Sequence, residues 1–190
     1  HLLFEKVSFG AGNIKICTSD AVAMYPNILN AEGINACDQS FKLYAHECKS
    51  FFPRELIVKL LRLIMTINVF EFGNMYWVQK DGTAMGMPCA CNYATIVFSY
   101  YERTSIHPSF KQNLLLYLRY IDDIFIVWKD IPSDPDAFDR FKTELNMQCN
   151  LNWITEDKSY KTNFLDLTIE VDRYTSSFTT RTYQKASNLF

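Results

Sequence analysis

Three features that are common in other protein classes are missing from this sequence. No apolar run reaches the roughly 18 residues that a membrane-spanning helix needs, and the residues that follow His1 show no leader-peptide pattern. The six cysteines form no C-x-x-C pair and stand in no paired histidine spacing, so a zinc site is not expected. We therefore expect an intracellular protein with reduced thiols and no membrane partner.

An excess of positive charge is also missing. The chain has 19 Lys and Arg against 21 Asp and Glu, for a formal net charge of −2. Nucleic acids usually select a basic surface, so this balance counts against a nucleic-acid enzyme. Two explanations would reconcile it: basic binding surfaces encoded outside this chain, or an acidic centre that holds cations.

The composition predicts one folded, globular domain. Of the 190 residues, 48% are hydrophobic and 15% aromatic, enough for one packed core, whereas two independent domains would both be undersized. The predicted elements are mixed and show no regular βαβ alternation. This order favours an α+β fold, with an antiparallel sheet and helices packed on one face.

Periodicity and turn residues locate these elements. Helices are predicted over about 36–49, from Ser50 and Pro53 to Ile67, over 89–103 and over 136–147. Strands are predicted over 13–18, 69–72, 75–79, 114–121, 124–128, 151–155, 164–171 and 177–183. The helix after Pro53 is expected to be mostly core, because these residues form an apolar face: Leu56, Leu60, Leu63, Ile64 and Ile67.

The most informative feature is the pair Asp122-Asp123 inside the otherwise apolar segment 116–128. Two ionised carboxylates beside a core repel each other and lose hydration, so a cation is expected to compensate them. The alternative is a solvated turn, where paired aspartates are common. Asp20, at the end of an earlier strand, favours the cation, because neighbouring central strands would bring it beside the pair.

Oxygen-only ligands suit Mg²⁺, with Mn²⁺ as a substitute. We expect two Mg²⁺ ions held by Asp20, Asp122 and Asp123, with Asp20 and Asp122 bridging the ions and Asp123 peripheral. Two ions in such a site activate an attacking hydroxyl and stabilise the leaving oxygen of an in-line displacement. Extension of a primer 3′-hydroxyl is a reaction of this kind.

Three segments resemble reverse-transcriptase motifs A, B and C in their order and rough spacing. They are Asp20-Ala-Val-Ala-Met-Tyr25, Gly82-Thr-Ala-Met-Gly-Met-Pro88 and Tyr120-Ile-Asp-Asp123. Together with Asn163–Ile169 and Thr182–Lys185, the stretch from Gly82 to Ala94 is most similar to Penelope-like retroelement reverse transcriptases. The resemblance covers the chain from about Ile14 onward. It implies a right-hand polymerase palm over 1–190, with a fingers segment at about 30–80.

The resemblance also implies individual roles. Asp20 is a metal ligand and the Ala21 carbonyl completes that ion's shell, while Tyr25 lies beneath the incoming sugar and excludes a ribose 2′-hydroxyl. Met85 and Gly86 contact nucleotide and template, although many reverse transcriptases have Gln-Gly there. Tyr25 could instead be an ordinary core aromatic, and the glycines at 82 and 86 plain turn residues. Cys91 departs from the variant's usual proline.

Further roles follow from the downstream motifs. Lys158 resembles the motif D lysine that protonates pyrophosphate, with Lys161 as a near competitor. Tyr120, Tyr183 and Lys185 are implied to contact primer and template. The implied partners are an RNA or DNA template, a DNA primer, deoxynucleotides and the remaining regions of a larger polyprotein: N-terminal fingers, thumb and nuclease, none of which is found in this sequence. A nuclear location would follow.

Two rival functions stay open. An RNA-templated RNA polymerase shares the fold but usually has glycine before Asp-Asp and an acidic group at the sugar, so Ile121 and Tyr25 disfavour it. The other rival is a domesticated or excerpted palm that binds nucleic acid or assembles with partners without catalysis. The intact aspartates argue against that decay, whereas the low charge keeps it open.

Overall fold

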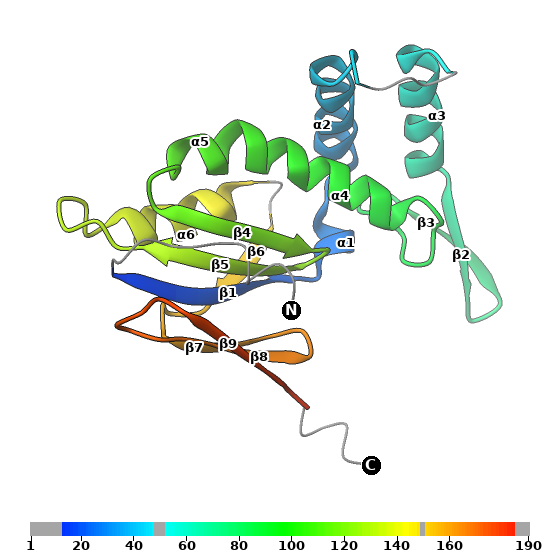
Figure 1. The fold of residues 1–190 in the computed structure, drawn as a ribbon. Coiled ribbons are helices and arrows are strands. Elements are labelled where there is room, and N and C mark those ends of the chain that lie inside the picture. The colour runs from blue at the N-terminus through cyan, green and yellow to red at the C-terminus, as the bar shows by residue number, and fades with distance from the viewer. Residues whose placement is uncertain (1–12, 48–51, 149–150, 185–190) are drawn as a thin grey trace. The chain divides into compact units, whose positions relative to one another are not determined.

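The computed structural model describes residues 13–47, 52–148 and 151–184 (Figure 1). Within these ranges no helix combines the length and the apolarity that a bilayer crossing requires. The chain divides into two compact units. The first comprises His1–Ala21, Ser109–Thr143 and Trp153–Phe190, and the second comprises Val22–Pro108 and Glu144–Asn152.

The first unit is built on a four-stranded sheet in the order β4-β5-β1-β6. Both neighbours of β5 run antiparallel to it. Five consecutive residues of β5, from Ile124 to Trp128, are buried. An uninterrupted apolar run is expected for a central strand that is covered on both faces. The strands are β1 (Ile14–Val22), β4 (Leu114–Tyr120), β5 (Asp123–Lys129) and β6 (Asn152–Thr155).

Different layers cover the two faces of β5. The rings of Phe138 and Phe141, on α6 (Ala137–Met147), contact Trp128 at centroid distances of 5.2 and 5.3 Å. Phe125 belongs to the core cluster that includes Ile169 of a second, three-stranded antiparallel sheet. This sheet has the order β7-β8-β9: Lys161–Phe164, Leu167–Val171 and Phe178–Thr182. The predicted helix layer is therefore present on one face, and a sheet covers the other.

The second unit is mostly helical. Helix α2 packs against both α3 and α4, and a short π-helix continues α4. The hairpin β2–β3 forms a separate two-stranded sheet. The elements are α1 (Met24–Asn27), α2 (Asn30–Leu43), α3 (Arg54–Thr66), β2 (Asn68–Phe72), β3 (Met75–Gln79), α4 (Ala90–Tyr101), the π-helix Glu102–Ile106 and α5 (His107–Ser109), whose last residue belongs to the first unit.

Three expectations from the sequence are wrong. The helix predicted over about 36–49 begins at Asn30 and ends at Leu43. The apolar face of α3 is not core: Leu56, Leu60, Leu63 and Ile64 are 41–53% exposed. The helical period identifies an apolar face but not what covers it. The segment 164–171 is also not one strand, because Leu165 adopts a left-handed φ of 53° and turns the chain between β7 and β8.

Candidate catalytic site

The acidic cluster of the first unit forms at one end of the four-stranded sheet. Strands β4 and β5 make a hairpin in which Tyr120 pairs with Asp123, and Ile121 and Asp122 form the turn. On the other side of β5, Asp20 of β1 pairs with Asp123. Directly opposed residues of antiparallel strands project from the same face, with Cβ atoms about 4.5–5.5 Å apart. Two carboxylates distant in sequence are therefore neighbours here.

Backbone contacts hold Asp122 beside them. The Ala21 N–H donates to the Asp122 carbonyl over 3.1 Å, which extends the β1–β5 ladder into the turn. Ile121 adopts a φ of 56°, in the left-handed region that β-branched residues rarely enter. Its carbonyl accepts a hydrogen bond from the Arg119 guanidinium over 3.0 Å. The backbone thus places Asp20, Asp122 and Asp123 on one strained turn and the strand beside it.

The acidic residues provide a pair of carboxylates for Mg²⁺, but they do not form a site with three protein ligands. Among the described residues, no group of three or more His, Cys, Asp or Glu side chains stands in a metal-ligand arrangement. Mg²⁺ is usually bound through one or two carboxylates, with waters and substrate phosphates completing its octahedron, rather than by an all-protein cage. The opposed pair Asp20 and Asp123 meets that lesser requirement. Asp20 is exposed and Asp123 is half-buried, so both carboxylates have access to solvent.

The predicted primer and template residues are located only in part. Tyr120 pairs with Asp123 and is 60% exposed, which gives an open ring beside the carboxylates. Tyr183 follows β9, and its N–H donates to the Asp166 carbonyl in the turn between β7 and β8. Lys185 lies outside the described residues.

Lys158 is not brought to the aspartates. Its ammonium donates a hydrogen bond to Asp130, which also pairs with Lys15 over 3.1 Å. The Lys158 ammonium lies 4.7 Å from the Phe138 ring centroid. Asp130 follows the far end of β5, on the order of 20 Å from Asp123 at about 3.3 Å per strand residue. Its competitor Lys161 is paired with Glu170 on β8. In this structure Lys158 closes an ion-pair cluster at the opposite end of the sheet.

In the second unit, Tyr25 and the glycine-rich loop are brought together. The Thr83 N–H donates to the Tyr25 carbonyl over 2.7 Å. Gly82 has a φ of +82° and lies against the Pro26 carbonyl, where any side chain would collide. The Tyr25 hydroxyl lies 3.3 Å from Cys91 Sγ on α4. The turn therefore requires glycine at 82, and the departure at Cys91 gives Tyr25 a contact that proline could not make.

Met85 and Gly86 line an open groove of about 960 Å³. Met85 is 75% exposed, and Gly86 has a φ of +88° with open space where a side chain would lie. Residues of β2 and β3 also line this groove. Thr83 also lines it, and its hydroxyl is buried without a hydrogen-bond partner among the described residues. The groove has room for a nucleobase-sized ligand.

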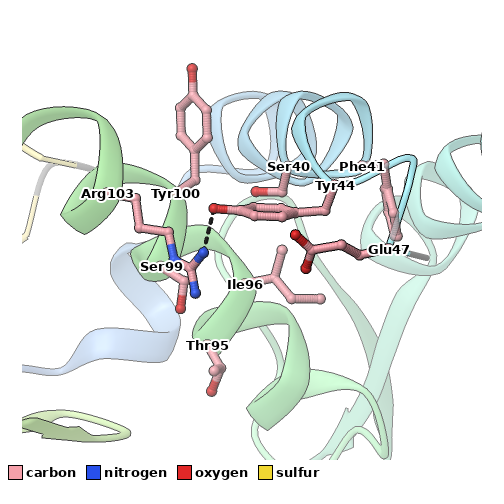
Figure 2. A pocket seen from close by; sticks show the side chains of 9 residues that line it. All are labelled: Ser40, Phe41, Tyr44, Glu47, Thr95, Ile96, Ser99, Tyr100 and Arg103. Carbon is pink, nitrogen blue, oxygen red and sulfur yellow. Dashed lines mark hydrogen bonds between the residues drawn. The ribbon is translucent and has the colours of Figure 1, made fainter.

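A second pocket was not foreseen from the sequence. It has a volume of about 440 Å³ and lies between α2 and α4 (Figure 2). Among its lining residues, Arg103 donates a hydrogen bond to the Tyr44 hydroxyl. The Arg103 guanidinium also lies 4.9 Å from the centroid of the Tyr44 ring. No motif links these two residues, which only the packing of the two helices brings together.

The fold has counterparts among solved structures, although no family model and no curated protein matches the sequence. Structures of telomerase, a reverse-transcriptase-related polymerase, are among those that match. Because the sequence identity is low, this likeness shows the fold alone. The chain has a reverse-transcriptase-like fold.

Three of these structures are as follows. Apo telomerase from Candida tropicalis truncated from its C-terminal domain has a TM-score of 0.65 and 11% identity, over 95% of this chain and 37% of that chain. Apo telomerase from Candida tropicalis has a TM-score of 0.65 and 12% identity, over 93% and 33%. Telomerase from Candida albicans with a TWJ fragment of telomeric RNA has a TM-score of 0.63 and 12% identity, over 91% and 32%. The chain spans about a third of the telomerase chains that it matches.

Proposed function

We propose that this chain is the catalytic core of an RNA-directed DNA polymerase, which adds deoxynucleotides to a DNA primer on an RNA or DNA template. In this proposal the chain is a right-hand palm with part of the fingers, from a Penelope-like retroelement. The remaining fingers, the thumb and any nuclease belong to a longer protein, and a nuclear location follows from that origin.

The observation that carries the proposal is the register of β1 on β5. It sets Asp20 directly opposite Asp123, although the two residues are about a hundred positions apart in sequence. A solvated Asp-Asp turn needs no third carboxylate on a neighbouring strand. The strained φ at Ile121 supports the same conclusion, because sparsely populated backbone conformations cluster at functional sites.

The side chains have distinct roles in this reaction. When bound, Mg²⁺ lowers the pKa of the primer 3′-hydroxyl and stabilises negative charge on the departing pyrophosphate. Asp20 and Asp123 lie on one face of the sheet, where they would hold the cation that accompanies the triphosphate. Asp122 joins them from the turn, and the Tyr120 ring offers a surface for the primer end. The side chains thus supply alignment and charge compensation.

Sugar selection is assigned to Tyr25. Its hydroxyl is engaged by Cys91 and its backbone carbonyl by Thr83, so the ring has little freedom to move away from a 2′-hydroxyl. The substrate class is therefore deoxynucleoside triphosphates. Telomerase from Candida albicans was solved with an RNA fragment, which supports a nucleic-acid partner here as well.

The test is primer extension by a protein that contains this chain, with Asp122→Asn compared against the wild type. We expect Asp122→Asn to abolish extension while the circular dichroism spectrum stays native. Asp136→Asn is the matched control, because it removes the same charge from an exposed carboxylate in the loop before α6 and should keep full activity.

The outcomes separate the rival functions. Full activity of Asp122→Asn would refute the metal-ligand role. Incorporation of ribonucleotides as readily as deoxynucleotides would instead favour an RNA polymerase. An inactive wild type that still binds a primer–template duplex would favour the non-catalytic binding module.

A further inference from the structure

The second unit carries a large exposed apolar surface. More than half of the exposed large hydrophobic side chains of the described residues lie between Leu56 and Val78. This stretch comprises α3 and the hairpin β2–β3, which follow each other at Ile67 without a loop. Monomeric proteins rarely leave contiguous apolar patches larger than a few hundred Å² uncovered, and larger ones mark interaction sites.

The strand register defines one face of the hairpin as wholly apolar. Phe70 pairs with Trp77 and Phe72 with Met75, so these four side chains project from the same face. They are 51%, 46%, 73% and 56% exposed, respectively. We call this set the hairpin face.

The hairpin is also structurally incomplete. Its sheet has two strands, and no third strand pairs with either edge among the described residues. An isolated two-stranded hairpin is at best marginally stable in water, and stability needs a third strand or a packed apolar face. The hairpin face is therefore expected to be covered in the folded protein.

We infer that a second copy of this chain covers the hairpin face, so that the hairpins of two copies pack against each other around a two-fold axis. The exposed area suits a weak dimer. At roughly 150–250 Å² per aromatic side chain, the three aromatic residues of the hairpin face expose on the order of 350 Å². This is about half of the roughly 800 Å² per partner of a standard interface, so the dimer is expected to dissociate on dilution.

The charge distribution favours a second copy over other partners. Glu71 is the only charged residue between Ile67 and Gln79, and it alternates with Phe70 and Phe72 onto the other face. A two-fold axis places identical surfaces together, and an uncharged face meets itself without burying an unpaired ion. A nucleic acid would need cations, which the hairpin face lacks.

Sedimentation equilibrium of the 190-residue chain over micromolar concentrations tests the inference. We expect the wild type to form dimers that dissociate on dilution. Phe72→Lys places a charge at the most exposed position of the hairpin face and should raise the dissociation constant at least about tenfold. Tyr174→Lys is the matched control, because Tyr174 is 90% exposed in the turn between β8 and β9. It should dimerise like the wild type.

Each other result overturns the inference. A wild type that stays monomeric at the highest concentration would mean that the hairpin face is covered by another part of the longer protein or by a different protein. Assemblies that grow beyond the dimer would rule out closure around a two-fold axis, and equal weakening by Tyr174→Lys would locate the contact elsewhere. Met75→Lys repeats the test if Phe72→Lys loses its native circular dichroism. Polymerase activity is not measured, so the result is independent of the proposed reaction.

Discussion

At the scale of single residues, the contact between Tyr25 and Cys91 links a predicted site residue to a position where this sequence departs from the reverse transcriptases that it resembles. The sequence marks Tyr25 through its motif and leaves Cys91 unexplained. In the structure the two side chains lie 3.3 Å apart across 66 positions. Cys91 is therefore a positioning residue for the ring that is proposed to select the sugar.

This contact predicts a graded change in sugar discrimination. Tyr25→Ala should admit ribonucleotides, and Cys91→Ala should relax discrimination less, because the ring remains but loses one restraint. Cys91→Ser can still hydrogen-bond the hydroxyl and should behave like the wild type. Ratios of kcat/KM for dNTP and rNTP measure the effect. Equal discrimination by Cys91→Ala and the wild type would show that Cys91 plays no part in sugar selection.

Cys17 makes a prediction about pH. Its thiol is buried on β1, and burial raises its pKa from 9.0 to about 12. The folded pKa lies above the unfolded value. The stability that comes from keeping the buried Cys17 thiol protonated is therefore fully present below pH 9 and is lost between pH 9 and about 12. The wild type should lose up to about 1.4 kcal/mol per pH unit more than Cys17→Ala in that window. Urea unfolding at pH 8 and pH 10.5 measures the difference, and parallel losses would contradict it.

At the scale of elements, the turn between β4 and β5 is where local preference and tertiary requirement conflict. The sequence predicts two strands flanking Asp122-Asp123, and the structure confirms both. It does not reveal that Ile121 takes a left-handed φ, because isoleucine has no preference for that region. The ladder on both sides of β5 imposes this conformation.

The strain at Ile121 can be isolated by comparing two substitutions. Ile121→Gly and Ile121→Ala both remove the side chain, but only glycine adopts a φ of 56° freely, so the glycine variant should be more stable by about 1 kcal/mol. At Leu118, within β4, the order should reverse, with glycine less stable than alanine by roughly 0.5–1 kcal/mol. Thermal unfolding of the four variants measures both differences. Alanine more stable than glycine at both positions would mean that the turn is unstrained.

Helix α3 illustrates the limit of periodicity at the same scale. Its apolar spacing correctly predicts a helix with one apolar face. The same spacing cannot distinguish a face that packs on the chain's own core from one that awaits a partner, because both need identical residues.

At the scale of the whole molecule, the carboxylate cluster should couple metal binding to folding. Any ion that binds only the folded state stabilises it by mass action. We expect millimolar Mg²⁺ to raise the unfolding free energy of the wild type by about 1 kcal/mol, which is a few degrees in Tm. Asp20→Asn should show little or no rise, and EDTA should reverse the wild-type rise. An equal rise in Asp20→Asn would place the bound ion elsewhere.

The sequence by itself determined the features that depend on neighbouring residues. These are the hairpin turn at Gly73-Asn74, the acidic turn after Tyr120, the helix predicted over 136–147 and the order of the three motif-like segments. Turn chemistry and hydrophobic periodicity act over a few residues and can be read directly. The three candidate aspartates followed from the same local patterns, whereas the other candidate site residues came from the resemblance to reverse transcriptases.

Only the tertiary structure decided which distant groups meet. The pairing register of β1 on β5 places Asp20 opposite Asp123. The ion pair with Asp130 holds Lys158 at the other end of β5. The left-handed turn at Leu165 split a predicted strand, and the packing of α2 on α4 created the Tyr44–Arg103 pocket. These outcomes depend on pairings between residues far apart in the chain, whose free energies are shared among many contacts that no local pattern records.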